Sequence, residues 1–341
     1  MEATALQIIW FLLFGVLIIG YAILDGFDLG VGVLSLFGKK GRERRLYLNA
    51  IGPVWDGNEV WLLTAGGALF AAFPPVYATV FSGFYLALML LLAALIFRAV
   101  SMEFRSKVDS PRWQSFWDWS FGLGSLVPAL LFGVAVGNIL RGIPLNAQGD
   151  FTGSFIGLLN PYSLLIGILS LVMFTCHGAL YMALKTDGDL RERMLGAAPK
   201  LWITWIACYI LATILSLFVS PWLFEGLLPN PLFWILFLAL LASLLFIPIA
   251  IRGDKPLAAL IASSVAIGTM TGLAGLSLFP YLVPSLSDLS YSLTVANASS
   301  TPRTLTTMLV IALLGMPIVI GYTIYIYRVF KGKVEITDES Y

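Results

Sequence analysis

Four carboxylates lie close together in a part of the chain that is otherwise strongly apolar. Asp25 and Asp28 occur in the segment GYAILDGFDLGVG, and Asp56 and Glu59 occur in GPVWDGNEVW. Charged side chains at bilayer depth are costly, so such residues are usually functional. Carboxylates can take up and release protons, and the two pairs lie on consecutive apolar segments joined by one turn. The pattern therefore indicates a route for protons.

The spacing of the acids suggests how helices would present them. Asp25 and Asp28 are three residues apart, which places both on one face of a helix. Asp56, Asn58 and Glu59 follow Trp55 in the first turn of the next apolar segment, where the positive end of a helix dipole favours acids. Two roles stay open for this second group: proton transfer, or a capping cluster at the level of the lipid headgroups.

Two further charged residues are expected at a similar depth. Arg98 falls at the end of the third apolar segment, and Asp118 falls at the start of the fourth. A buried carboxylate needs a partner or must bind a proton. Pairing of Arg98 with one of the acids would leave the others free to exchange protons.

His177 is the only histidine, and it lies within the fifth apolar segment. A haem ligand or a proton relay is one interpretation, but a single histidine cannot supply a bis-histidine haem and no Cys/His metal motif is present. We expect a structural, hydrogen-bonded histidine and no haem or metal bound by this chain alone. Cys176 and Cys208 are expected to serve packing.

The composition identifies the bilayer as the solvent of this chain. Of its 341 residues, 59% are hydrophobic and 11% are charged, and the mean hydropathy is +0.91. A water-soluble domain of this size does not need so much apolar surface. The net charge of +1 argues against a nucleic-acid partner.

Apolar runs predict nine membrane-spanning helices and no soluble domain. The expected spans are residues 6–37, 55–73, 76–97, 117–140, 160–184, 201–221, 232–251, 257–281 and 305–328. With the N-terminus outside and the C-terminus in the cytoplasm, 18 of the 20 Lys and Arg residues fall in cytoplasmic segments, and only Arg141 and Arg303 do not. The positive-inside rule therefore predicts that the acids lie toward the cytoplasm.

Several long motifs resemble subunit II of the cytochrome bd quinol oxidases. They are GYAILDGFDLGVG, GPVWDGNEVWLLTAGGALFAAFPPVYATVFSGFYLAL, FRAVSMEFRSK, WDWSFGLGSLVPALLFGVAVGN, LLNPYSLLIGILS and LAGLSLFPYLVPS. The resemblance covers essentially the whole chain. It implies an all-α membrane protein with two four-helix bundles (residues 1–150 and 151–300), followed by a peripheral ninth span and a cytoplasmic tail (residues 301–341).

The resemblance also implies a function and partners. In this family a heterodimer in the prokaryotic cytoplasmic membrane oxidises quinol, reduces dioxygen to water and generates proton motive force. Subunit I holds two haem b and one haem d, and small accessory subunits can be added to the pair. The family pattern assigns part of the cytoplasmic proton supply to acids that match Asp25, Asp28 and Asp56. Glu59 falls where some relatives carry glutamine.

Two other interpretations stay open from the residues. An ion-coupled secondary transporter also buries acids, although usually near the midplane on broken helices. Here the acids lie toward one edge of an apparently continuous span. The other interpretation is an assembly scaffold whose acids are inert.

Overall fold

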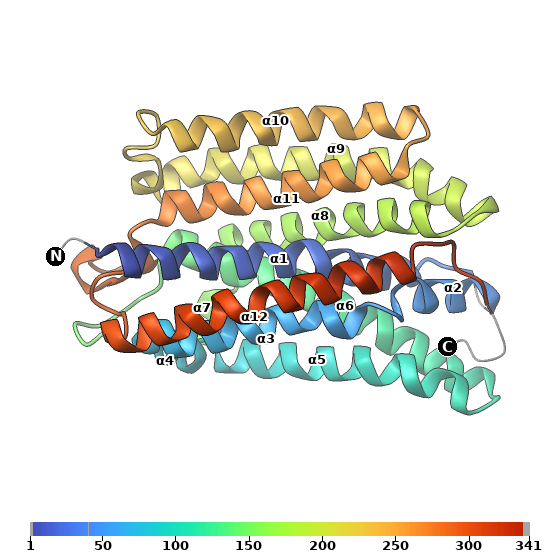
Figure 1. The fold of residues 1–341 in the computed structure, drawn as a ribbon, viewed down its shortest axis with the longest axis horizontal. Coiled ribbons are helices and arrows are strands. Elements are labelled where there is room, and N and C mark those ends of the chain that lie inside the picture. Colours follow the sequence, from blue (N-terminus) through green and yellow to red (C-terminus); the bar gives the residue numbers. More distant parts are fainter. Residues whose placement is uncertain (1–2, 40, 337–341) are drawn as a thin grey trace.

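The chain folds almost entirely into helices that run roughly side by side (Figure 1). The computed structural model describes residues 3–39 and 41–336. Within these, the α-helices are α1 (Ala5–Ser35), α2 (Arg42–Ile51), α3 (Trp55–Ala72), α4 (Pro74–Gly83), α5 (Tyr85–Phe104), α6 (Pro111–Arg141), α7 (Phe155–Leu158), α8 (Pro161–Lys185), α9 (Gly188–Val219), α10 (Pro231–Arg252), α11 (Pro256–Leu278) and α12 (Pro302–Val329).

Eight of the described helices are long and apolar enough to cross a membrane: α1, α5, α6, α8, α9, α10, α11 and α12. The remaining expected span, 55–73, corresponds to α3, which has 18 residues and a polar first turn. The expected span 76–97 differs in another way, because the helix is interrupted at Phe84 between α4 and α5. The mainly helical membrane fold is confirmed.

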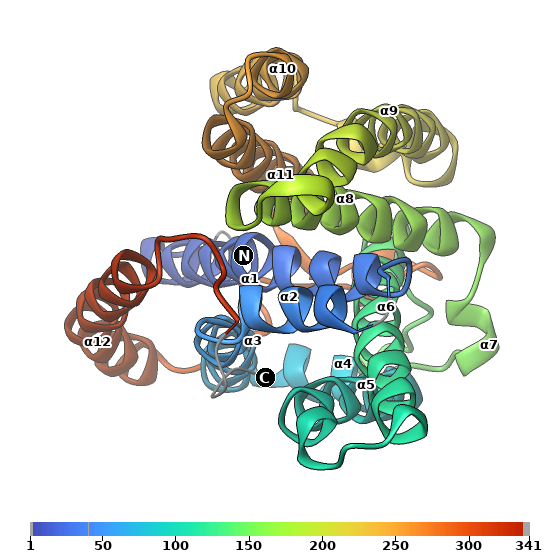
Figure 2. The ribbon, with the colours of Figure 1, turned by 90° about the vertical axis from the view of Figure 1, so that its right-hand side faces the viewer.

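Helix α1 lies at the centre of the molecule and contacts α3, α6, α8, α11 and α12 (Figure 2). Its second half, from Asp25 to Ser35, is entirely buried. The approach to α8 is close enough to require glycine. A Cβ on Gly30 would lie 1.9 Å from the carbonyl oxygen of Phe174, and one on Gly178 would lie 2.5 Å from the carbonyl carbon of Gly30. The glycines beside the acids therefore admit a neighbouring helix.

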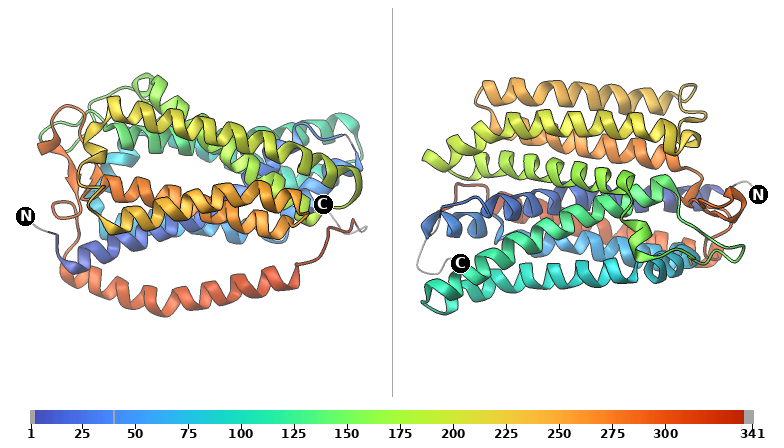
Figure 3. Two further views of the ribbon diagram at one scale, coloured as in Figure 1. Left: turned by 90° about the horizontal axis from the view of Figure 1, so that it is seen from above. Right: turned by 180° about the vertical axis from the view of Figure 1, so that it is seen from behind.

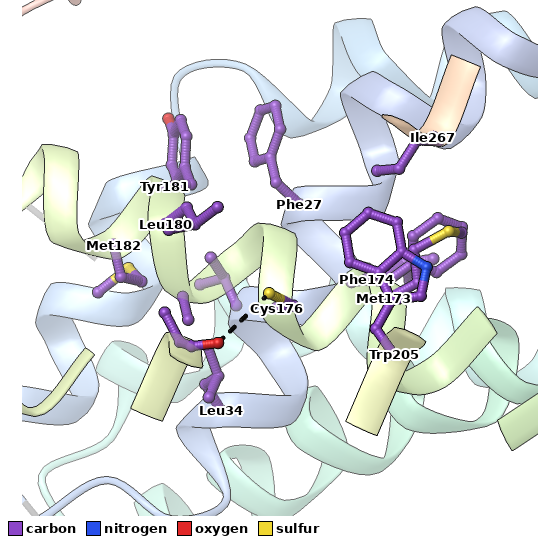
Figure 4. Packing of buried hydrophobic residues seen from close by; sticks show 14 of the residues in the cluster. Phe27, Leu34, Met173, Phe174, Cys176, Leu180, Tyr181, Met182, Trp205 and Ile267 are labelled. Carbon is purple, nitrogen blue, oxygen red and sulfur yellow. Dashed lines mark hydrogen bonds between the residues drawn. The ribbon is translucent and has the colours of Figure 1, made fainter. Parts of the chain in front are cut away.

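The main hydrophobic core joins α1 and α8 to their neighbours (Figure 4). Phe27 and Tyr181 stack with ring centroids 4.0 Å apart, and the Tyr181 hydroxyl donates a hydrogen bond to the Ala50 carbonyl at 2.9 Å. Cys176 is free and buried, and its Sγ lies 3.8 Å from the carbonyl oxygen of Ala198. Cys208 is free and packs against the same core, so both cysteines serve packing as expected.

The two ends of the molecule differ in structure. At one end, a short antiparallel pair of strands, β1 (Tyr281–Val283) and β2 (Leu293–Thr294), packs beside the loop after α6. At the other end lies α2, whose Tyr47 is buried. Burial and the nearby Glu43 carboxylate raise the pKa of Tyr47 to about 12, so this phenol stays neutral at physiological pH.

Helix α12 runs along the outside of the molecule (Figure 3). It contacts α1 and α3, and Leu305 is its only buried residue. The exposed side chains of α12 are largely apolar, which is typical of a surface that faces lipid or another membrane protein.

Candidate functional site

The four predicted acids differ sharply in their exposure. Asp25 and Asp28 on α1 are fully buried, with no exposed surface. The side chain of Glu59 on α3 is 23% exposed, and Asp56, less than one turn earlier, is exposed. The fold therefore places the four carboxylates in a series that begins at the surface and ends inside the protein.

Arg98 of α5 joins the acids of two helices. Its Nη2 lies 2.7 Å from Asp25 Oδ1, and its Nη1 lies 3.2 Å from Asp25 Oδ2 and 2.9 Å from Glu59 Oε1. The guanidinium is fully buried, so this is a forked ion pair shielded from water. The expected pairing of Arg98 with an acid is thus observed, and it involves two acids at once.

Among the described residues, Asp28 pairs with no cation and is held by an amide instead. Asn58 Nδ2 donates a hydrogen bond to Asp28 Oδ2 at 2.7 Å, and the same nitrogen lies 3.3 Å from the carbonyl oxygen of Leu24. Asp28 Oδ1 is buried and has no hydrogen-bond partner among the described residues. An unsatisfied carboxylate oxygen is unfavourable inside a protein, so this atom is suited to carry a proton or to meet water.

Charge balance within this group, which we call the acid cluster (Asp25, Asp28, Glu59, Arg98 and Asn58), favours proton uptake. If all three carboxyl groups were ionised, the single guanidinium would balance one negative charge and leave two uncompensated. Uncompensated buried charge is costly, so the group is more stable when it holds a proton. Such a site can accept and pass on protons.

Other predicted residues lie outside the acid cluster. Asp118 pairs with Arg105, whose Nε lies 2.6 Å from Asp118 Oδ1, so it does not compete for Arg98. Trp55 is partly buried and packs against the main core. Asp56 lies on the surface near Glu59, and its side chain makes no hydrogen bond or ion pair within the described part of the chain. The structure therefore places Asp56 as a surface acid next to the cluster.

One contact of the site was missed by sequence reasoning. The hydroxyl of Tyr327, on α12, donates a hydrogen bond to Asn58 Oδ1 at 3.0 Å. No sequence signal indicated this contact, because the two residues are 269 positions apart and Tyr327 is one of several tyrosines near the end of α12.

His177 is held in place by two hydrogen-bond partners. Its Nδ1 lies 2.6 Å from Ser263 Oγ, and its Nε2 lies 3.1 Å from the carbonyl oxygen of Ile23. A carbonyl can only accept, so Nε2 carries a hydrogen, while Nδ1 faces the Ser263 hydroxyl, which itself lies 2.8 Å from the Leu260 carbonyl oxygen. The histidine is fixed between α1, α8 and α11, with both ring nitrogens in contact with groups of the chain. In the described part of the chain, no group of three or more His, Cys, Asp or Glu side chains could hold a metal ion.

Comparison with known proteins identifies the family. The family model for cytochrome bd terminal oxidase subunit II matches residues 6–330. Cytochrome bd-I ubiquinol oxidase subunit 2 from Escherichia coli K12 is 38% identical over 99% of this chain and 97% of its own length. A probable cytochrome oxidase subunit 2 from Haemophilus influenzae is 40% identical, covering 97% of this chain and 95% of the relative.

A further relative and a solved structure agree with this family. Cytochrome bd ubiquinol oxidase subunit 2 from Bacillus subtilis is 37% identical over 97% of both chains. A chain of the bd oxidase from Geobacillus thermodenitrificans superposes with a TM-score of 0.79 over 96% of this chain and 99% of that chain, at 18% identity, which shows a shared fold. By sequence along nearly its whole length, this chain belongs to the cytochrome bd terminal oxidase subunit II family.

Proposed function

We propose that this chain, as subunit II of a bd-type quinol oxidase, delivers protons from the cytoplasmic side toward the centre where dioxygen is reduced. The observation that carries the proposal is the acid cluster, in which Arg98 joins the buried Asp25 to the partly exposed Glu59, and Asn58, on the same helix as Glu59, holds the buried Asp28. Reduction of one dioxygen to two waters consumes four protons and four electrons. A buried site that accepts protons suits this demand.

The proposed direction of transfer follows from the distribution of basic residues. With the N-terminus outside and the C-terminus inside, the first turn of α3 faces the cytoplasm. Protons would then meet Asp56 at the surface, pass Glu59 and reach Asp28. Water entering beside Glu59 would satisfy the free Oδ1 of Asp28 and complete the connection. Asp25, neutralised by Arg98, would hold the group together.

The proposed assembly places the redox chemistry in the partner. Subunit I would hold two haem b and one haem d and oxidise the quinol, and this chain would ligate no haem, which agrees with the engagement of both His177 nitrogens. We include α3 as a ninth span, with α1, α3, α5 and α6 in one bundle, α8 to α11 in the second, and α12 outside both. Family membership favours the oxidase subunit over an ion-coupled transporter.

Substitution of Asp28 tests the proposal. Asp28→Asn keeps the size of the side chain but cannot exchange a proton in this pH range, so we expect slow oxygen reduction by a complex with normal haem content. Asp109→Asn, an exposed acid at the same end of the molecule, is the matched control and should leave turnover unchanged. Full turnover per haem in the assembled Asp28→Asn complex would show that the path does not run through this carboxyl group.

A further inference from the structure

Helix α12 reaches the acid cluster through one hydroxyl group. The helix lies on the outside of the molecule, and yet Tyr327, in its last turn, is partly buried and turned inward to Asn58. Two nearby tyrosines on the same helix, Tyr322 and Tyr325, are 63% and 62% exposed. Tyr327 therefore differs from these two tyrosines because its side chain points into the protein.

The hydrogen bonds around Asn58 fix the orientation of its amide. The Tyr327 hydroxyl donates to Oδ1, while Nδ2 faces two acceptors, Asp28 Oδ2 and the Leu24 carbonyl. A flipped amide would turn its oxygen toward both of these acceptors, which is unfavourable. The amide is therefore oriented to donate to Oδ2 of Asp28.

The inner end of α12 is itself anchored to another part of the fold. The Lys185 side chain donates to the carbonyls of Phe330 and Gly332, and the amide of Val334 donates to the Lys185 carbonyl at 2.9 Å. Lys333 Nζ donates to the Thr186 carbonyl at 2.7 Å. The segment after α12 is thereby attached to the turn between α8 and α9, which holds Tyr327 in register with Asn58.

We infer that Tyr327 is a positioning residue: through the Asn58 amide it keeps Oδ2 of Asp28 occupied and leaves Oδ1 as the oxygen that receives the transferred proton. This inference deepens the proposed function and rests on it. Proton transfer requires a donor or acceptor in a fixed orientation, and a misplaced group slows the step even when its chemistry is intact. Without the Tyr327 hydroxyl, only the two contacts of Nδ2 hold the amide, so its position against Oδ2 of Asp28 is less firmly fixed.

Removal of one hydroxyl in the complete oxidase tests the inference. Tyr327→Phe should lower oxygen-reduction turnover per haem on the order of threefold to tenfold, the size expected for one lost hydrogen bond, and should displace the pH profile of turnover. Tyr325→Phe on the exposed side of the same helix is the matched control and should behave like the native complex. Asn58→Ala should also slow turnover, and Tyr327→Phe combined with Asn58→Ala should be no slower than Asn58→Ala alone, because both act through one link.

The outcomes separate this inference from the proposed function. If Asp28→Asn slows turnover but Tyr327→Phe matches Tyr325→Phe in rate and pH profile, only the positioning role is wrong. Additive losses in the double variant would also overturn it. If Asp28→Asn retains full turnover, the proposed function itself fails. If Tyr327→Phe lowers the haem content of the complex, the Asn58→Ala complex decides through its turnover per haem and the pH profile of that turnover. A native pH profile in Asn58→Ala contradicts the inference.

Discussion

The forked ion pair of Arg98 should be essential for assembly rather than for proton transfer. Its guanidinium is fully buried and lies within 3.2 Å of three carboxylate oxygens on α1 and α3. Replacing it by a neutral chain of similar length, Arg98→Met, leaves Asp25 buried without a partner. Removal of one member of a buried pair costs about 3–5 kcal/mol. Since folded domains are stable by about 5–15 kcal/mol, this loss should greatly reduce the amount of assembled complex.

A double substitution shows whether such a loss comes from the uncompensated charge of Asp25. Arg98→Met combined with Asp25→Leu removes both buried charges, and replacing a buried pair by apolar residues is often neutral. The measured quantities are the haem content per amount of membrane protein and the midpoint temperature of haem loss. We expect both to fall in Arg98→Met and largely to recover in the double variant. Native assembly of Arg98→Met would refute the view that this pair holds α1, α3 and α5 together.

Two further predictions concern packing and orientation. Gly30→Ala should prevent assembly, because the added Cβ would lie 1.9 Å from the backbone oxygen of Phe174. Gly15→Ala is the control and should be tolerated, because no atom lies within 4 Å of the added Cβ. The haem content of the complex measures both outcomes. In a background where both native cysteines are replaced, a single cysteine at the exposed Ser106 should react with an impermeant reagent only in inverted vesicles, and one at the exposed Ser287 only in intact cells. The opposite labelling pattern would show that the acid cluster lies toward the outer side of the membrane.

Much of the fold follows from apolar runs in the sequence, because the bilayer sets the length of a spanning helix. The helix ends were predicted less well. The fourth and sixth spans were expected to begin at 117 and 201, but α6 begins at Pro111 and α9 at Gly188. Hydropathy marks where a helix leaves the lipid, and the helix itself can continue into water. The break at Phe84 was not predicted either. The sequence around it has no proline, and the single glycine, Gly83, is too weak a signal to end a helix.

The site was predicted in its residue types but only partly in its contacts. Charged residues inside apolar segments are rare enough that Asp25, Asp28 and Arg98 could be singled out from the sequence. Helix adjacency sets which of them meet, and that depends on tertiary packing. The Arg105–Asp118 pair and the link from Tyr327 to Asn58 therefore became visible only with the fold.

Proton uptake during a single turnover tests the central claim most directly. The fully reduced complex is mixed with dioxygen, and the uptake of protons from the cytoplasmic side is followed with a pH-sensitive dye. We predict that Asp28→Asn delays proton uptake and the oxidation step coupled to it, while the initial binding of dioxygen keeps its native rate. Native proton uptake by the assembled Asp28→Asn complex would contradict the claim that this chain supplies protons through its buried acids.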